Sequence, residues 1–476
     1  MRDYDLVIAH GDVVTPDAVR PLDVGIADGR IAALGAPGTL AGASRTVDAA
    51  GMIVFPGVID VHLHCNIRSH HVDTLPVTTA AAARGGVTSA IIHLLPSAAE
   101  EVLPTDLLAE FRDLGERAGV IDFSFHAWLA ERDGVLEAIP RLIEAGISSF
   151  KLFLAYKSIG RMASDGYLLS AMDAIAAAGG VLLVHAEDGE IIDRRIAIQR
   201  GRGRVGPADF RWTHPDEAEW LAIGKALQYA RLTGCPLYVV HVSTPHGAHM
   251  IASARDEGQA VWAETCPQYL ELTDQELERR GPLAKISPPL RDRAAADGLW
   301  AHLAAGRIQV VGSDHSPHSR ETKAGGYRDI FDCWYGAPGV QTMLPVMWDA
   351  FQRHQLPIPM LARLLAAAPA QIFGLSGKGV IAPGMDADLV VIDPKREVEI
   401  RDEHQAGGSG YSLYHGRRVR GWPTMSFLRG QVLLDGETLR QPEGFGRYIA
   451  RRASQPALTV EPGRAPSPRS PRTTSR

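Results

Sequence analysis

Cysteines and long apolar runs are scarce in this sequence, and each absence excludes a class of protein. The 476 residues include only four cysteines, which are scattered and form no CxxC pair. A disulfide framework is therefore excluded, and we expect a protein of the reducing cytoplasm. No segment has the roughly 18 uninterrupted apolar residues of a membrane span. The start, MRDYDLVIAHGDVV, also lacks the basic first part and long apolar core of a signal peptide.

The chain has no excess of positive charge either. It contains 49 Lys and Arg against 55 Asp and Glu, a formal net charge of −6. This balance provides no basic surface for nucleic acid, so we expect neither a nucleic-acid partner nor a membrane partner. What is present, 45% hydrophobic and 22% charged residues, is typical of a globular protein that can bury a large core.

Both ends of the chain consist of short β-like segments separated by glycines. YDLVIAHGDVV and PLDVGIADGRIAAL lie near the start, and GMDADLVVIDPKREVEI and SFLRGQVLLDGE lie near the end. We predict that residues 1–54 and 376–450 together form one small β-sandwich domain. The last segment, 454–476, is rich in Pro, Ser, Thr and Arg and is predicted to be a disordered tail.

Between these ends, apolar strand-like runs alternate with helical stretches. The eight runs are 53–62, 88–95, 121–129, 148–155, 180–185, 236–242, 260–266 and 308–314. Strands that are apolar on both faces are typical of parallel sheets, and their alternation with helices favours β/α units. We therefore predict an α/β fold, a TIM-like (β/α)8 barrel over residues 55–375, whose chemistry lies at the carboxyl ends of the strands.

Several of these strand ends carry side chains that can bind a metal ion. His62 and His64, in DVHLH, are two residues apart, so an extended strand points both imidazoles to one side. Taken alone, an HxH pair or a single strand-end histidine is more often structural. His185, His241 and Asp314 end other apolar runs, however, and a barrel would bring all five side chains to one mouth.

A lysine lies inside the apolar segment SSFKLFLAYK. Burying an unpaired ammonium is costly, so Lys151 needs an explanation. One interpretation is a side chain that extends to solvent or pairs with a carboxylate. The other is a lysine with a depressed pKa, whose neutral amine is modified by CO2 to a carbamate that can bridge two metal ions.

In order and spacing, these segments resemble the cyclic amidohydrolases of the amidohydrolase superfamily. The similarity is greatest to hydantoinases and dihydropyrimidinases, with allantoinases and dihydroorotases as close relatives, and it covers roughly residues 3–445. The segments that carry the resemblance are PGVIDVHLH, GGVTS, SFKLFLAYK, VHAEDG, VVHVST, ETCPQYL, ISPPLR, GSDHSPH and GKGVIAPGMDADLVVID.

The resemblance implies a binuclear metal site and a ring-opening hydrolysis. The implied ligands of two divalent ions, expected to be zinc, are His62, His64, carboxylated Lys151, His185, His241 and Asp314. A metal-activated hydroxide would attack a ring carbonyl that Tyr156 polarises, and Asp314 would act as the base. Ser287, in ISPPLR, would hold the ring amide through its main chain. His315 either orients Asp314 or has no part in proton transfer.

The segments that would touch the substrate depart from the hydantoinase pattern. Asn66 follows the HxH pair as in allantoinases, and Arg68 stands two positions beyond the arginine of dihydroorotases. Tyr335, in CWYGAPGVQ, replaces the asparagine that is usual in hydantoinases. We therefore predict Asn66, Arg68 and Tyr335 as substrate contacts, although Arg68 could also be a solvated loop residue.

Other residues of the segment CNIRSHH are expected to have different roles. Cys65 is expected to be a small packing residue, and His70 and His71 are expected to lie on a loop over the barrel mouth without belonging to the metal machinery.

Three hypotheses remain for the function. The first is a hydantoinase-type or dihydropyrimidinase-type hydrolase, and the second is an allantoinase or a specialised lactam or imide hydrolase. The third is a non-catalytic scaffold, which the full ligand set argues against. The resemblance also implies a homotetramer or a dimer.

Overall fold

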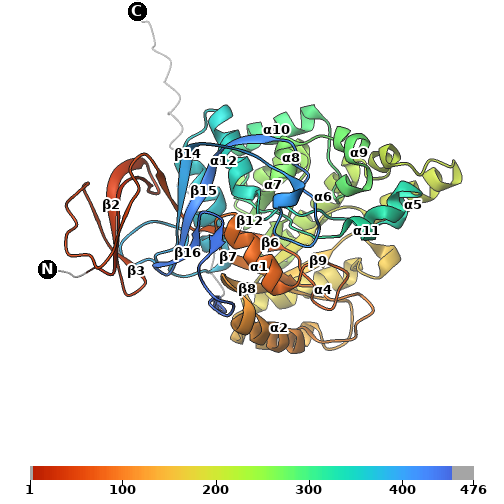
Figure 1. Ribbon diagram of the computed structural model, residues 1–476. Coiled ribbons are helices and arrows are strands. Elements are labelled where there is room, and N and C mark those ends of the chain that lie inside the picture. Colours follow the sequence, from red (N-terminus) through yellow and green to blue (C-terminus); the bar gives the residue numbers. More distant parts are fainter. Residues whose placement is uncertain (1–3, 453–476) are drawn as a thin grey trace, which may run out of the picture.

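The barrel and a β-rich unit beside it are both seen in a computed structural model, which describes residues 4–452 (Figure 1). The predicted disordered tail, 454–476, lies outside the described residues. Among the helices of the described part, none is both long and apolar enough to cross a membrane.

The predicted barrel is confirmed as eight parallel strands that neighbour one another in chain order. Its strands are β6 (Val58–Leu63), β7 (Val87–Leu94), β8 (Asp122–Trp128), β9 (Ser149–Phe153), β10 (Val181–His185), β11 (Leu237–Val239), β12 (Val261–Thr265) and β13 (Val310–Val311). The ring is completed just after β13, where Leu63 forms a parallel bridge with His315. The His64 amide donates to the His315 carbonyl at 2.7 Å, so the ends of β6 and β13 lie side by side.

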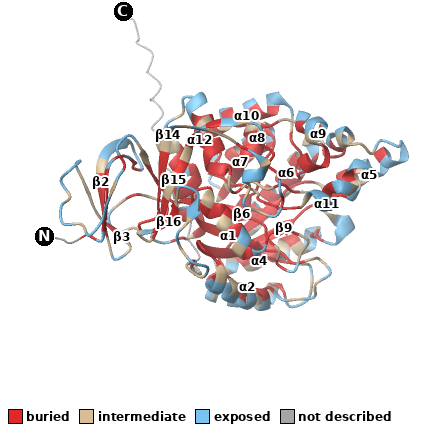
Figure 2. Cartoon of the chain, viewed as in Figure 1, coloured by how far each residue is buried: buried red, intermediate tan, exposed pale blue. Residues whose placement is uncertain are grey.

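Helices surround this barrel and explain why most residues of its strands are apolar. They are α1 (Leu75–Arg84), α2 (Pro104–Ala118), α3 (Ile139–Glu144), α4 (Asp165–Ala178), α5 (Gly189–Gly201), α6 (Asp216–Thr233), α7 (Pro245–Asp256), α8 (Pro267–Glu271), α9 (Gln275–Arg280), α10 (Arg293–Ala304), α11 (Arg320–Lys323), α12 (Met343–Arg353), α13 (Ile358–Ala362) and α14 (Ala368–Phe373). Every residue of β6 to β10 is buried, whereas the outer faces of the helices are exposed (Figure 2). A strand covered on both faces needs apolar side chains on both.

The two chain ends form one β unit, as predicted. Its nine-stranded sheet contains β1 (Leu6–Val14), β2 (Val19–Ala27), β3 (Arg30–Gly35), β4 (Thr46–Asp48), β5 (Ile53–Pro56), β14 (Leu389–Glu399), β15 (Arg418–Leu428), β16 (Gln431–Asp435) and β17 (Thr438–Leu439). In this sheet β5 pairs antiparallel with β14 and parallel with β1, so it joins the early and late segments. The unit lies beside one end of the barrel (Figure 1).

The predicted strand 53–62 is in fact two strands that belong to different units. Residues of β5 belong to the end sheet, and the barrel strand β6 starts after Gly57. A Cβ atom at Gly57 would lie 2.2 Å from Thr88 Oγ1, so only glycine permits this crossing between the units. The sequence boundary drawn at residue 54 therefore falls inside β5.

The last described residues return to the barrel. Tyr448 forms a parallel bridge with Phe123 of β8, and Arg451 Nε donates to Ser124 Oγ at 2.8 Å. Arg451 is fully buried, so this return is part of the packed barrel end.

Candidate active site

Most of the predicted site residues line a single pocket at the mouth of the barrel. They are His62, His64, Lys151, Tyr156, His185, His241, Ser287, Asp314 and Tyr335. The metal-ligand candidates come from or directly follow five different strands, β6, β9, β10, β11 and β13. The carboxyl ends of parallel strands meet at one face of a barrel, and this gathers side chains that are far apart in sequence.

The first group of possible ligand atoms combines His62, His64 and Asp314. Asp314 Oδ1 lies 3.3 Å from Nε2 of His62 and 3.5 Å from Nε2 of His64. On its other side, His62 Nδ1 lies 2.6 Å from Glu264 Oε1 of β12. Glu264 accepts a further bond from the Tyr238 hydroxyl at 2.8 Å. Burial raises the pKa of Glu264 to about 7. In its ionised form Glu264 accepts the proton of His62 Nδ1, which leaves a lone pair on Nε2 that faces Asp314.

The second group combines His185 and His241. His185 Nδ1 lies 2.9 Å from His241 Nε2, so two ring nitrogens point at one another. His185 Nε2 lies 2.9 Å from Glu187 Oε2. Burial opposes ionisation of Glu187, but nearby His214 and the hydrogen bond from His185 lower its pKa to about 2. An ionised Glu187 fixes the His185 proton on Nε2, and the Nδ1 lone pair then faces His241.

These imidazoles are neutral. Burial lowers the pKa of His62 and His241 well below the usual value, and it lowers the pKa of His64 and His185 as well. A neutral imidazole is the form that binds a metal ion. The site therefore offers lone pairs at ordinary pH.

Lys151 lies in β9 with its side chain inside the barrel. It is 1% exposed, and its Nζ has no hydrogen-bond partner within residues 4–452. Burial lowers the pKa of Lys151 to about 7. The sequence left open a lysine that extends to solvent or pairs with a carboxylate. The structure instead places a buried amine in the metal-ligand pocket.

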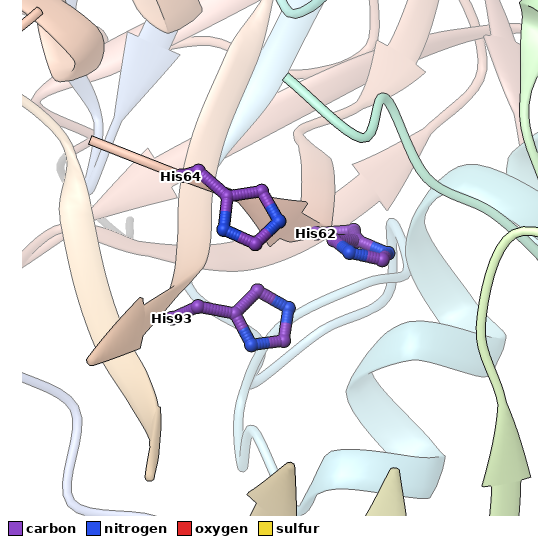
Figure 3. A group of neighbouring side chains, drawn as sticks. All are labelled: His62, His64 and His93. Atoms are coloured by element: carbon purple, nitrogen blue, oxygen red, sulfur yellow. The ribbon is translucent and has the colours of Figure 1, made fainter. Parts of the chain in front are cut away.

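His93 of β7 is a site residue that the sequence analysis missed. Nitrogens of His62, His64 and His93 lie within 4.8 Å of one another, and Figure 3 shows the three rings together. Neither ring nitrogen of His93 has a hydrogen-bond partner in the described part of the chain. A signal was present, because His93 lies near the end of the apolar run 88–95, as His185 and His241 lie at or near the ends of theirs.

Three of the predicted residues that line the pocket have a left-handed backbone. The φ angles are 66° at Tyr156, 41° at His241 and 47° at Asp314. Non-glycine residues rarely adopt positive φ, and such residues cluster at functional sites, where the surrounding structure holds them. This backbone aims each of these side chains from the end of its strand.

Tyr156, Ser287 and Tyr335, the other predicted residues of the pocket, also line it. The Tyr156 ring centroid lies 4.8 Å from that of His185 and 5.5 Å from that of Tyr335. Burial raises the pKa of Tyr156 well above its usual value, so its hydroxyl stays protonated and can donate a hydrogen bond. Ser287 Oγ donates to Glu187 Oε2 at 2.5 Å, which ties the ISPPLR loop to the second ligand group.

Asn66 and Arg68 do not reach this pocket, in contrast to the prediction. Arg68 is half exposed and pairs with Glu110 of α2, with Glu100 at 4.0 Å. Asn66 Oδ1 instead accepts from the Ser69 amide at 3.2 Å and stabilises the loop itself. Opposite charges at the surface and a local turn thus decide the orientation of these side chains.

The other residues of this loop behave largely as predicted. His70 and His71 line the mouth of the pocket, and Cys65 is 2% exposed within the hydrophobic core. His70 and His71 form a further group of three neighbouring histidines with His318. His315 Nδ1 accepts from the Gly339 amide at 3.1 Å and Nε2 lies 3.6 Å from Asp73. These contacts favour a structural position for His315.

The side chains present fit divalent metal ions. Two ring nitrogens are oriented by buried carboxylates, one carboxylate oxygen faces two imidazoles, and the amine of Lys151 is buried without a partner in the described chain. Zinc sites in enzymes typically use imidazole and carboxylate ligands. The nitrogen of each ligating histidine that does not face the metal often donates to a second carboxylate.

Comparisons with known proteins agree with the family resemblance of the sequence. The model of the amidohydrolase family matches residues 53–433. The chain is 33% identical over 458 residues to a D-hydantoinase of Ralstonia pickettii, covering 94% of this chain and 99% of that protein. It is 36% identical over 444 residues to an allantoinase of Rubrobacter xylanophilus, covering 92% and 95%. A solved D-hydantoinase structure matches with a TM-score of 0.90 and 33% identity, covering 94% of this chain and 99% of the other.

Proposed function

The chain belongs to the amidohydrolase family, and from this premise we propose that it opens the ring of a cyclic amide by hydrolysing a C–N bond. The observation that carries the proposal is the pocket in which six predicted ligands meet, with His62 and His185 oriented by buried carboxylates. The substrate class is that of hydantoins, dihydropyrimidines and related cyclic imides and ureides.

We propose two divalent ions, zinc by the chemistry of the donors, as the cofactors. The residues that would hold them are His62, His64, Lys151 as a carbamate, His185, His241 and Asp314. When bound, the ions supply Lewis acidity and lower the pKa of water.

The remaining chemistry is assigned to side chains of the pocket. Asp314 accepts a proton from the attacking water and delivers it to the ring nitrogen that leaves. The Tyr156 hydroxyl donates a hydrogen bond to the carbonyl oxygen as charge develops there. The main chain at Ser287 positions the ring amide, and Tyr335, 5.5 Å from Tyr156 between ring centroids, bounds the ring on one side.

An allantoinase is the second candidate. It is supported by the 36% identity to a relative of that name and by Asn66 after the HxH pair. The Asn66 side chain accepts a hydrogen bond within its own loop. The likeness to allantoinases at this position therefore concerns the conformation of the loop and not a contact with the substrate. The scaffold hypothesis is disfavoured because no predicted ligand is missing from the pocket. A homotetramer or dimer in the cytoplasm remains a prediction.

A test combines metal analysis with a substrate panel. Purified protein should contain about two divalent ions per chain, lose its activity with a chelator and regain it with zinc. Hydantoin, dihydrouracil, allantoin, dihydroorotate and simple imides should be compared for ring opening. Protein without bound metal, or with metal but inert toward every ring in the panel, would contradict the proposal.

A further inference from the structure

One arginine in the active-site pocket has no role in the chemistry described above. Arg161 follows the short segment after Tyr156, lines the pocket, and is 7% exposed. Its charge acts on the rings of His64 and His70, whose pKa values are lowered chiefly by burial and also by this neighbour. The guanidinium therefore belongs to the same pocket lining as His64 and His70.

The surroundings of this guanidinium are apolar. It stacks over the ring of Trp128 at 4.8 Å and lies 5.9 Å from the centroid of Phe153. Its Nη2 donates to the Pro96 carbonyl at 2.7 Å. Its Nη1 has no partner, and no carboxylate of residues 4–452 lies within 4.0 Å of the group.

A buried cation without an anion is costly, and proteins normally pair it. Burial lowers the pKa of Arg161 only to about 10, so the group remains charged at neutral pH. Other arginines near the mouth are accounted for: Arg68 pairs with Glu110, and Arg132 Nη2 donates to the Ala98 carbonyl at 2.5 Å. Arg161 is thus a charged residue of the pocket lining with one buried donor, Nη1, that has no acceptor in residues 4–452.

The rest of the pocket defines what could reach this donor. Asp314, at the ligand cluster, is the only carboxylate among the lining residues of the described chain. Leu95, Phe153, Ile159 and Trp334 contribute apolar walls. The cavity therefore offers catalytic groups, an apolar wall and one unpaired cation.

We propose that the substrate ring carries an apolar stem ending in a carboxylate, and that this carboxylate pairs with the Arg161 guanidinium. The proposal rests on the proposed function, since the ring is the one opened at the ligand cluster. An arginine pairs well with a carboxylate because its planar fork offers parallel N–H donors. The specificity arginine that the sequence suggested at Arg68 is then supplied from a different loop.

The test uses the metal-loaded enzyme and two matched ligands. One is a hydantoin with a carboxyethyl substituent, and the other carries the uncharged carbamoylethyl isostere. We expect the wild type to prefer the acid in kcat/KM by about 10- to 100-fold, the range of a hydrogen bond to a charged group. Arg161→Met should remove this preference mainly through KM, because the contact is to the substituent and not to the bond that breaks. Arg161→Lys should keep part of it.

The matched control is Arg132→Met, which removes an arginine at the same end of the barrel that only bonds carbonyls and does not line the pocket. It should leave the preference unchanged. Thermal unfolding of each variant separates loss of folding from loss of recognition, and Arg161→Lys keeps the test valid if Arg161→Met does not fold.

Calorimetric binding of both ligands distinguishes failure of the carboxylate inference from failure of the proposed ring opening. Turnover of the isostere at least as fast as the acid, or an unchanged preference in Arg161→Met, overturns the carboxylate inference and leaves ring opening intact. If neither ligand is hydrolysed and every ring of the panel above is also inert, the proposed function fails. The inference is then decided by affinity, and equal affinities of wild type and Arg161→Met for the acid overturn it.

Discussion

Replacing Lys151 by methionine tests the centre of the proposed site. Methionine keeps an unbranched chain of similar length but cannot take up CO2. Lys151 is buried and its amine has no hydrogen-bond partner in the described structure, so the apolar replacement should fold. We expect Lys151→Met to lose bound metal and ring-opening activity together.

The structure also gives the size of the effect that prepares this lysine for modification. Burial lowers its pKa from the usual 10.5 to about 7. This corresponds to about 5 kcal/mol in favour of the neutral amine. At pH 7 about half of the metal-free protein then carries a neutral Lys151, against about one molecule in 3,000 for an unperturbed lysine. Only the neutral amine can add to CO2 and release a proton to give the carbamate.

The assay is carbonyl-carbon NMR after equilibration with isotopically labelled bicarbonate, together with metal analysis. Wild type should show a carbamate signal that Lys151→Met lacks. Lys323→Met is the control, because Lys323 is also buried with its pKa lowered to about 7, but its Nζ donates to the Lys285 carbonyl at 2.8 Å outside the pocket. It should keep the signal. A Lys151→Met enzyme with full metal content and activity would refute the reasoning.

Two further predictions concern the reaction and the assembly of the fold. Tyr156→Phe should lower kcat by about 10²- to 10³-fold, the loss typical of one oxyanion donor, with little change in KM; steady-state kinetics with unchanged kcat would contradict the assigned role. Lys378→Met should lower the free energy of unfolding by about 3–5 kcal/mol, because it leaves buried carboxylates without their cation. Lys378 Nζ lies 2.8 Å from Asp122 of the barrel and 2.6 Å from Asp388 beside β14. Denaturant unfolding measures this loss, and an unchanged midpoint would show that the link between the two units contributes nothing.

The sequence was sufficient where one local rule decided the outcome. The two-residue period of a strand put His62 and His64 on one side, and continuous apolar runs predicted a parallel barrel. The end of each run then pointed to His185, His241 and Asp314. A lysine inside an apolar run already required a neutral or compensated amine.

Contacts between distant segments were beyond such rules. Glu264 begins the segment ETCPQYL, yet only the barrel places its Oε1 atom 2.6 Å from His62 Nδ1. Gly57 divided one apolar run between two sheets because Thr88 leaves no room for a side chain.

The substrate side was decided by tertiary structure for the same reason. Arg68 follows His62 and His64 in sequence, but Glu110 of α2 holds it at the surface. Arg161, nearly a hundred residues later, lies inside the pocket against Trp128. Sequence periodicity determined which strand ends carry the predicted metal ligands, because each strand imposes its own spacing. Only the packed barrel decided which charged side chains line the pocket, because that depends on neighbours from other strands and loops.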